Sequence, residues 1–260
     1  MGERKTMTEY QVFTVILYGF MVVAIGTFIA LFYKTASYGR HATKGWGPLI
    51  PNKAAWVIME APASLLFLLY FLIADRTITI TLVAFQVIWQ IHYFHRSFIF
   101  PFMLRSNEKV SLSIIIFGML FNSINTYIQG RWVYNFAPSG AYSDAWITDP
   151  RFIAGVIIFA IGFIINKQSD AITRKLWDPD NPGYKIPYGG MFRYVSCPNY
   201  LGEIITWVGW AVMTWSLAGL FFVLWTAANL VPRAWTNHRW YHEKFADYPP
   251  ERKAIIPLLF

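Results

Sequence analysis

The sequence predicts an all-α integral membrane protein with seven transmembrane helices. Of its 260 residues 56% are hydrophobic and 14% are charged, whereas soluble domains average about 25% charged residues. Long apolar runs with few charges recur along the chain, which is typical of a polytopic membrane protein. The single cysteine, Cys197, excludes an intrachain disulfide and an all-cysteine metal site. At this length, residues 1–260 are expected to form one membrane domain.

Each predicted span is an apolar segment close to the ~20 residues that cross a bilayer. The segments are 11–33, 55–74, 78–100, 111–130, 152–166, 200–215 and 217–231. The last three are short for full spans. Only a turn at Trp215-Ser216-Leu217 separates the last two, so six spans are expected if that pair is one long helix.

The distribution of basic residues indicates the orientation. With seven spans, most of the 22 Lys and Arg residues fall on the side that carries the C-terminus. Cytoplasmic loops carry an excess of Lys and Arg, so we expect the N-terminus outside and the C-terminus in the cytoplasm. The orientation in the membrane thus accounts for the net charge of +8, and no nucleic-acid partner is expected.

Glu60 is an ionisable residue near the start of the second segment, two residues before Pro62. Pro62 favours a place in the first turn of a helix, where a carboxylate exposed to water suits the helix dipole. The alternative is a functional role, because a charge within a membrane is costly. The sequence leaves both interpretations open.

The third segment contains His92, His95 and Arg96 on one helical face, with Tyr93 beside them. Zinc sites need three or four ligands, and no further ligand set accompanies the two histidines, so no metal is expected. A proton donor, Tyr93, within an orienting network is favoured. Packing of Tyr93 in an interfacial aromatic belt is the simpler alternative.

Asn122 and Asn125 in the fourth segment predict hydrogen bonds between helices. Asn166, Asp170 and Arg174 recur at four-residue spacing on one helical face. That face is either a solvated helix end with an Asp–Arg pair, or a ligand-binding stripe. In the second case Asp170 accepts from a ribose or an amide and Arg174 donates to phosphate.

The C-terminal stretch Lys185–Phe260 combines a long apolar run with polar groups at both of its ends, among them Glu203. An ionisable group at the mouth of an apolar helix is a functional-site hypothesis. The chain contains no G-x-G-x-x-G, Walker or H-E-x-x-H motif, so a nucleotide site would have to be built between helices.

Several motifs, in order and nearly from end to end, resemble those of the steroid 5α-reductase family. They are Ser37–His41, Ala54–Trp56, Glu60–Pro62, His92–Arg96, Tyr188–Ser196, Asn199–Ile205, Trp215–Leu217 and Phe245–Pro257. The Asn-Tyr-Leu-Gly-Glu piece alone is also similar to sterol reductases and isoprenylcysteine methyltransferases.

The resemblance implies NADPH-dependent reduction of a Δ4-3-ketosteroid, with hydride transfer to C5 and a proton to C4. It implies that Glu60 and Tyr93 hydrogen-bond the C3 carbonyl, in a substrate pocket mainly from helices in 11–130. It implies an NADPH site mainly from 166–260. The positions that match cofactor-binding residues of the family are Arg96, Arg105, Asn166, Asp170, Arg174, Tyr184, Lys185, Asn199, Glu203, Arg233, Asn237 and Tyr241.

Five positions depart from the family pattern and bear on substrate identity and cofactor affinity. Met59 stands where Gln is familiar and Phe100 where Tyr is familiar. Asn237 replaces His, and Trp177 and Lys185 each replace Arg. Lys lacks the bidentate geometry of Arg.

Three classes of function are weighed. The favoured one is an enone reductase acting on a steroid or another flat lipid enone. The second is a membrane methyltransferase of the isoprenylcysteine type that uses S-adenosylmethionine. The third is a lipid transporter, which would have paired halves with broken helices; no such symmetry is visible. We expect a monomer among membrane lipids, in a bacterial inner membrane or the endoplasmic reticulum.

Overall fold

The computed structural model describes residues 7–34, 47–105, 108–180 and 183–260, and these are predominantly helical. The motif at Ser37–His41 lies outside the described residues. The α-helices are α1 Glu9–Tyr33, α2 Asn52–Leu72, α3 Ile80–Phe94, α4 Phe100–Met103, α5 Leu112–Arg131, α6 Pro150–Lys175, α7 Pro198–Thr214 and α8 Leu217–Lys244. Two π-helical turns, η2 His95–Ile99 and η3 Trp132–Phe136, and two 3₁₀ turns, η4 Asp144–Thr148 and η5 Gly190–Arg193, join them.

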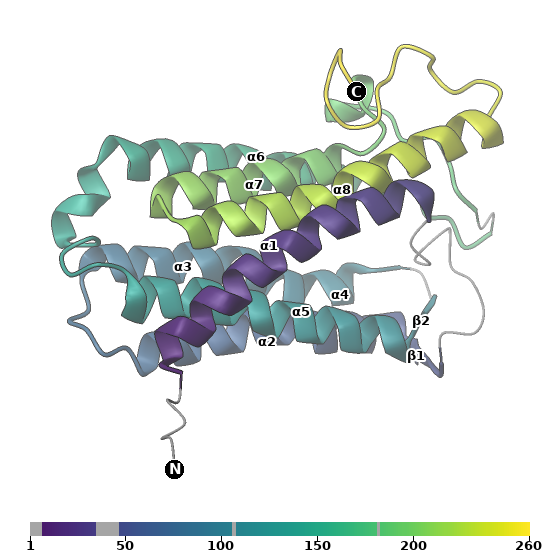
Figure 1. The fold of residues 1–260 in the computed structure, drawn as a ribbon. Coiled ribbons are helices and arrows are strands. Elements are labelled where there is room, and N and C mark those ends of the chain that lie inside the picture. Colours follow the sequence, from purple (N-terminus) through teal and green to yellow (C-terminus); the bar gives the residue numbers. More distant parts are fainter. Residues whose placement is uncertain (1–6, 35–46, 106–107, 181–182) are drawn as a thin grey trace.

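The helices form two layers, with α6, α7 and α8 in one and α2, α3 and α5 in the other (Figure 1). Helix α1 crosses the bundle and packs mainly on α8. At one end of the bundle, β1 Leu49–Pro51 pairs with β2 Lys109–Ser111 in an antiparallel ribbon. The all-α fold class is therefore confirmed.

Among the described residues, five helical segments are long and apolar enough to cross a membrane. They are Glu9–Tyr33, Asn52–Leu72, Leu112–Phe136, Pro150–Lys175 and Leu217–Lys244. The other two predicted spans correspond to α3, which continues through η2 into α4, and to α7. These are shorter as single α-helices, so the count of seven and the orientation stay predictions. Exposed large apolar side chains along α1, such as Val15, Val22 and Ile25, suit a helix that faces lipid rather than water.

The last two predicted segments are separate helices. Trp215 has a left-handed backbone conformation with φ 44° and ends α7. The Ser216 side chain then accepts from the backbone N–H of Gly219 and starts α8, as N-caps do. The alternative that this pair forms one long helix is therefore wrong. The fifth segment was also predicted too short, since α6 continues to Lys175.

Helix α6 begins at Asp149, whose side chain caps the helix and pairs with Arg151. Asp149 Oδ1 accepts from the Arg151 backbone N–H at 2.8 Å, and Oδ2 accepts from Arg151 Nη2 at 2.8 Å. These bonds to the Arg151 side chain and backbone lower the pKa of Asp149 from 3.8 to about 2. The cap is therefore ionised at any physiological pH.

Glycine allows α6 and α7 to pack with their backbones in contact. A Cβ atom on Gly162 of α6 would lie 2.3 Å from the Thr206 nitrogen and 2.6 Å from the Gly202 oxygen of α7. Gly155 and Gly209 make a second contact of this kind two turns away. Close backbone approach through small residues is typical of helices packed within membranes. It fixes the position of α6 relative to α7, and the contact at Gly162 and Gly202 lies next to polar residues described below.

Candidate active site

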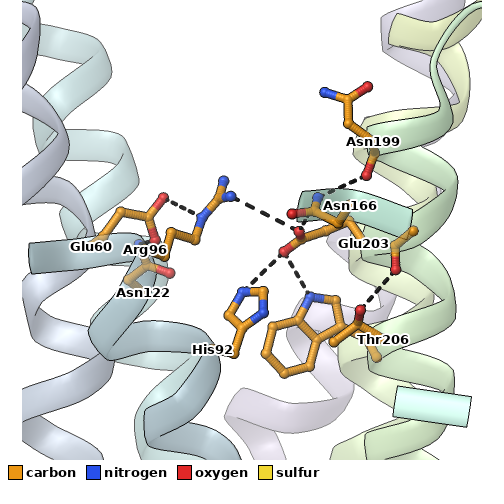
Figure 2. A network of polar contacts seen from close by, with 10 residues as sticks. Glu60, His92, Arg96, Asn122, Asn166, Asn199, Glu203 and Thr206 are labelled. Carbon is orange, nitrogen blue, oxygen red and sulfur yellow. Dashed lines mark hydrogen bonds and ion pairs between the residues drawn. The ribbon is translucent and has the colours of Figure 1, made fainter. Parts of the chain in front are cut away.

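Glu60 lies in the middle of α2, and its side chain is buried. The prediction that Pro62 places Glu60 in a solvated first turn is wrong, because α2 begins at Asn52, about two turns earlier. Both carboxylate oxygens are hydrogen-bonded. Oε1 accepts from Arg96 Nε at 2.9 Å, and Oε2 accepts from Asn122 Nδ2 at 3.2 Å (Figure 2). Glu60 is therefore an internal carboxylate held by two donors from other segments.

Arg96 links the two layers of the bundle. It lies on η2, a π-helical turn, a feature that is frequent at functional sites. Its Nε binds Glu60 of α2, while its Nη1 lies 3.9 Å from Glu203 Oε2 of α7. One guanidinium group thus contacts both Glu60, which is predicted to bind the substrate, and Glu203, which is predicted to bind the cofactor.

Glu203 is the centre of the second half of the network. Its carboxylate accepts from Trp207 Nε1 at 3.2 Å and from Asn166 Nδ2 at 3.0 Å. His92 Nε2 lies 3.3 Å from Glu203 Oε1. Asn166 Nδ2 also donates to the backbone oxygen of Asn199 at 2.9 Å. The structure therefore brings together Asn166, Asn199 and Glu203, three of the residues predicted for the cofactor (Figure 2).

Tyr93 is buried beside this network. Its ring lies 4.7 Å from that of Trp89 and 5.6 Å from that of Trp207, and the His92 ring meets it edge-on at 4.9 Å. Among the described residues no direct hydrogen bond joins Tyr93 to Glu60. Tyr93 is thus an aromatic core residue and also a neighbour of the polar groups, so neither prediction for it is excluded.

The other residues predicted for the cofactor lie on α6 and α8, in the loop between α6 and η5, and beyond α4. Asp170 and Arg174 follow Asn166 on α6, and the Arg174 guanidinium lies 5.9 Å from the centre of the Phe100 ring. In the part of the chain that the structure describes, Asp170 and Arg174 do not form an ion pair with each other. Arg233 lies on α8, and its Nε is buried without a partner among the described residues.

Four more predicted residues lie in the last turns of α8 or in the loop between α6 and η5. Asn237 Nδ2 lies 3.7 Å from Cys197 Sγ, and the Tyr184 ring meets Trp240 edge-on. Tyr241 is buried, while Lys185 pairs with Asp178 at 3.1 Å. Arg105 is exposed beyond α4. The predicted cofactor residues therefore occupy more than one region of the fold.

Some residues of the site were not predicted as such. Trp207 stands four residues after Glu203 on α7, a spacing that puts both on one face; this signal was present in the sequence. Ser196 had no local signal. Its Oγ lies 2.6 Å from His238 Nδ1 and 2.7 Å from the Tyr248 hydroxyl, which ties the chain end to α8.

Asn122 makes the hydrogen bonds between helices that the sequence predicts, since its Nδ2 donates to α2. Asn125 instead accepts from Gln129 within α5, at 3.4 Å. Among the described residues no group of three or more His, Cys, Asp and Glu side chains is placed to hold a metal ion.

Comparison with known proteins gives a consistent result. Residues 108–260 match the family model described as 3-oxo-5-alpha-steroid 4-dehydrogenase. The chain is 40% identical to steroid 5-alpha-reductase DET2 of Gossypium hirsutum, over 100% of both chains. It is 38% identical to 3-oxo-5-alpha-steroid 4-dehydrogenase 1 of Rattus norvegicus, over 94% of this chain and 93% of the relative. For the enzyme of the same name from Homo sapiens the identity is 40%, over 86% of each chain.

Proposed function

The chain belongs to the 3-oxo-5-alpha-steroid 4-dehydrogenase family, and on that premise we propose that it reduces the Δ4 double bond of a 3-oxo-steroid with NADPH. One observation carries the proposal beyond the family. Arg96 joins Glu60, the residue expected at the steroid carbonyl, to Glu203, a residue expected at the cofactor. A hydride acceptor and its donor must lie next to each other, and this network connects the two expected sites.

On the substrate side, the reaction needs hydrogen-bond donors at the C3 carbonyl oxygen. Reduction at C5 develops enolate charge on that oxygen, and donors fixed in a buried site stabilise such charge. The Tyr93 hydroxyl supplies one donor. Glu60 supplies a second when it is protonated or shares a proton with Tyr93. The positive charge of Arg96 beside Glu60 further favours negative charge in this pocket.

On the other side, the side chains suit NADPH, which supplies the hydride when it is bound. Asn166 Oδ1 and Arg233 Nε are both buried without a partner among the described residues. Buried polar atoms are normally hydrogen-bonded, so both are suited to a polar ligand. An amide oxygen accepts from a carboxamide, and a guanidinium donates to phosphate. We assign Asn166, Asn199 and Glu203 to the nicotinamide end, and Arg174 and Arg233 to the phosphates.

The same proposal includes seven spans with the C-terminus in the cytoplasm. The two shorter candidates are the run α3–η2–α4 and helix α7. The excess of Lys and Arg in the loops on the C-terminal side supports this orientation. It would give the residues assigned to NADPH access to the cytoplasmic pool.

The test is turnover of testosterone and of progesterone by the purified protein, with NADPH and with NADH in parallel. We expect 5α-dihydro products and a preference for NADPH. If NADPH binds but neither steroid is reduced, the substrate is another lipid enone, and the departure at Met59 is the first place to examine. If NADPH does not bind, the proposal fails and S-adenosylmethionine is the next ligand to test.

A further inference from the structure

The segment of α2 that carries Glu60 also contains Pro62. Proline has no N–H, so the backbone oxygen of Ile58 loses its normal partner within the helix, and the neighbouring turn is disturbed. Side chains from adjacent helices can satisfy the backbone of such a segment inside a membrane protein. Three backbone oxygens here accept from side chains of α3 and α5: Met59 O from Asn122 at 2.7 Å, Ala63 O from Trp89 at 2.8 Å and Ser64 O from Gln90 at 2.9 Å.

Asn122 differs from the other two donors because it also contacts the Glu60 side chain. Its Nδ2 carries two hydrogens. It donates to Met59 O at 2.7 Å and to Glu60 Oε2 at 3.2 Å. Two acceptors on consecutive residues therefore share one amide group, and the buried Asn122 side chain fixes the Glu60 carboxylate relative to its own backbone.

We propose that Asn122 is a positioning residue of the reduction, acting through Glu60. The inference rests on the proposed function, in which Glu60 polarises the substrate carbonyl. Arg96 holds Oε1 of Glu60, and Asn122 holds Oε2. With both oxygens held, the carboxyl group has a single orientation in which to meet a substrate. Without Asn122, rotation about the side-chain torsions is opposed only by Arg96, whose other end is already directed toward Glu203.

The alternative is that Asn122 merely ties α5 to α2. Gln90 offers a matched control, because it also bonds a backbone oxygen of α2 near Pro62, but among the described residues its hydrogen bonds are with Ser64 alone. A change to leucine in either residue removes the amide at similar volume. Loss of a bond to a buried acceptor destabilises the protein in both cases. Only the Asn122 variant is expected to disturb the carboxylate.

The experiment compares Asn122→Leu and Gln90→Leu with the wild type, using testosterone and NADPH. We expect Asn122→Leu to lower kcat by about tenfold or more, since small misplacements of catalytic groups have effects of this size or larger. The KM for NADPH should change by less than about twofold, because the substitution does not affect the binding of the cofactor. Gln90→Leu should lower thermal stability and leave kcat within about twofold of the wild type. Asn122→Ser, which is smaller and polar, is the second variant if Asn122→Leu does not fold.

A double-mutant cycle decides whether Asn122 acts through Glu60. In a Glu60→Gln background, Asn122→Leu should change kcat by less than about twofold, because residues that act as a unit are not additive. An equal loss of kcat in both backgrounds would overturn the proposal. A loss of kcat in Gln90→Leu as large as that in Asn122→Leu would also overturn the proposal.

A spectroscopic readout separates this proposal from the proposed function. The infrared band of the Glu60 carboxyl group, identified by its loss in Glu60→Gln, should shift in Asn122→Leu and stay in place in Gln90→Leu. If the wild-type protein does not bind NADPH, the proposed function fails, while the infrared comparison still tests the Asn122–Glu60 bond. An unchanged band in Asn122→Leu refutes the inference alone.

Discussion

The contact between α6 and α7 makes Gly162→Ala a sharp test of how the site is built. The added Cβ atom would lie 2.3 Å from the Thr206 nitrogen. That is roughly 1 Å short of the ~3.5 Å at which non-bonded heavy atoms are comfortable. The obstacle is backbone, so no side-chain rotation relieves the clash, and the helices must move apart.

The expected cost follows from that displacement. Overpacking a well-packed contact typically costs about 1–3 kcal/mol. At about 2–4 °C per kcal/mol for proteins approaching this size, the melting temperature should fall by roughly 2–12 °C. Asn166 follows Gly162 by one turn, and Glu203 follows Gly202, so the 3.0 Å hydrogen bond between them should lengthen as well. We therefore expect weaker NADPH binding together with the loss of stability.

The assay is thermal unfolding of the detergent-solubilised protein, with NADPH titration on the same preparation. Gly26→Ala on α1 is the control, because a Cβ there meets nothing within 4 Å. Alanine is a better helix former than glycine by about 1 kcal/mol, so this variant should be no less stable than the wild type. Equal melting temperatures for the two variants would refute the description of a backbone-to-backbone contact.

Three further predictions concern single side chains. Tyr93→Phe should lower turnover by about tenfold or more and leave NADPH affinity unchanged, because it removes one hydrogen-bond donor to the substrate carbonyl. Normal turnover would show that Tyr93 does not have this role. The control is Tyr142→Phe, which loses a buried hydrogen bond to the Thr214 oxygen away from the network. Arg233→Ala should raise the Kd for NADPH by about tenfold or more, as expected for a lost charge-assisted bond; an unchanged Kd would move the phosphate site elsewhere. Asp149→Asn should lower the melting temperature equally at pH 6 and pH 8. The lowered pKa of about 2 keeps the carboxylate ionised at both values, so its contribution is lost only as the pH falls below the ordinary range of Asp. A difference that shrinks from pH 8 to pH 6 would contradict this.

Local patterns in the sequence predicted much of the helical framework. The apolar segments correspond to α1, α2, α5 and α6, and the third segment corresponds to α3 with its π-helical continuation. The stripe of Asn166, Asp170 and Arg174 does lie on one helix, α6. These features depend on residues close to one another in the chain, which is why periodicity and charge placement suffice for them.

The misses have a common physical cause, since each depends on a partner far along the chain. Pro62 favours a helix start, whereas α2 continues through it from Asn52 to Leu72, and donors from α3 and α5 bind the nearby backbone oxygens of Met59 and Ala63. The pairing of Arg96 with Glu60 joins residues 36 positions apart. No local pattern indicated the glycine contact that aligns Asn166 with Glu203. Neither helix, taken alone, shows that its glycines meet the other helix.

In the network of Figure 2, the contacts of His92 Nε2 and Arg96 Nη1 with the opposite layer both end on the carboxylate of Glu203. His92 and Arg96 reach it from the layer of α3, while Asn166 and Trp207 hold it in the layer of α6 and α7. The contact between the two layers at this point therefore depends on the single residue Glu203, although each layer is rigidly packed. A ligand that binds Glu203 would share this carboxylate with His92 and Arg96, so that binding at Glu203 is coupled to the contact between the two layers.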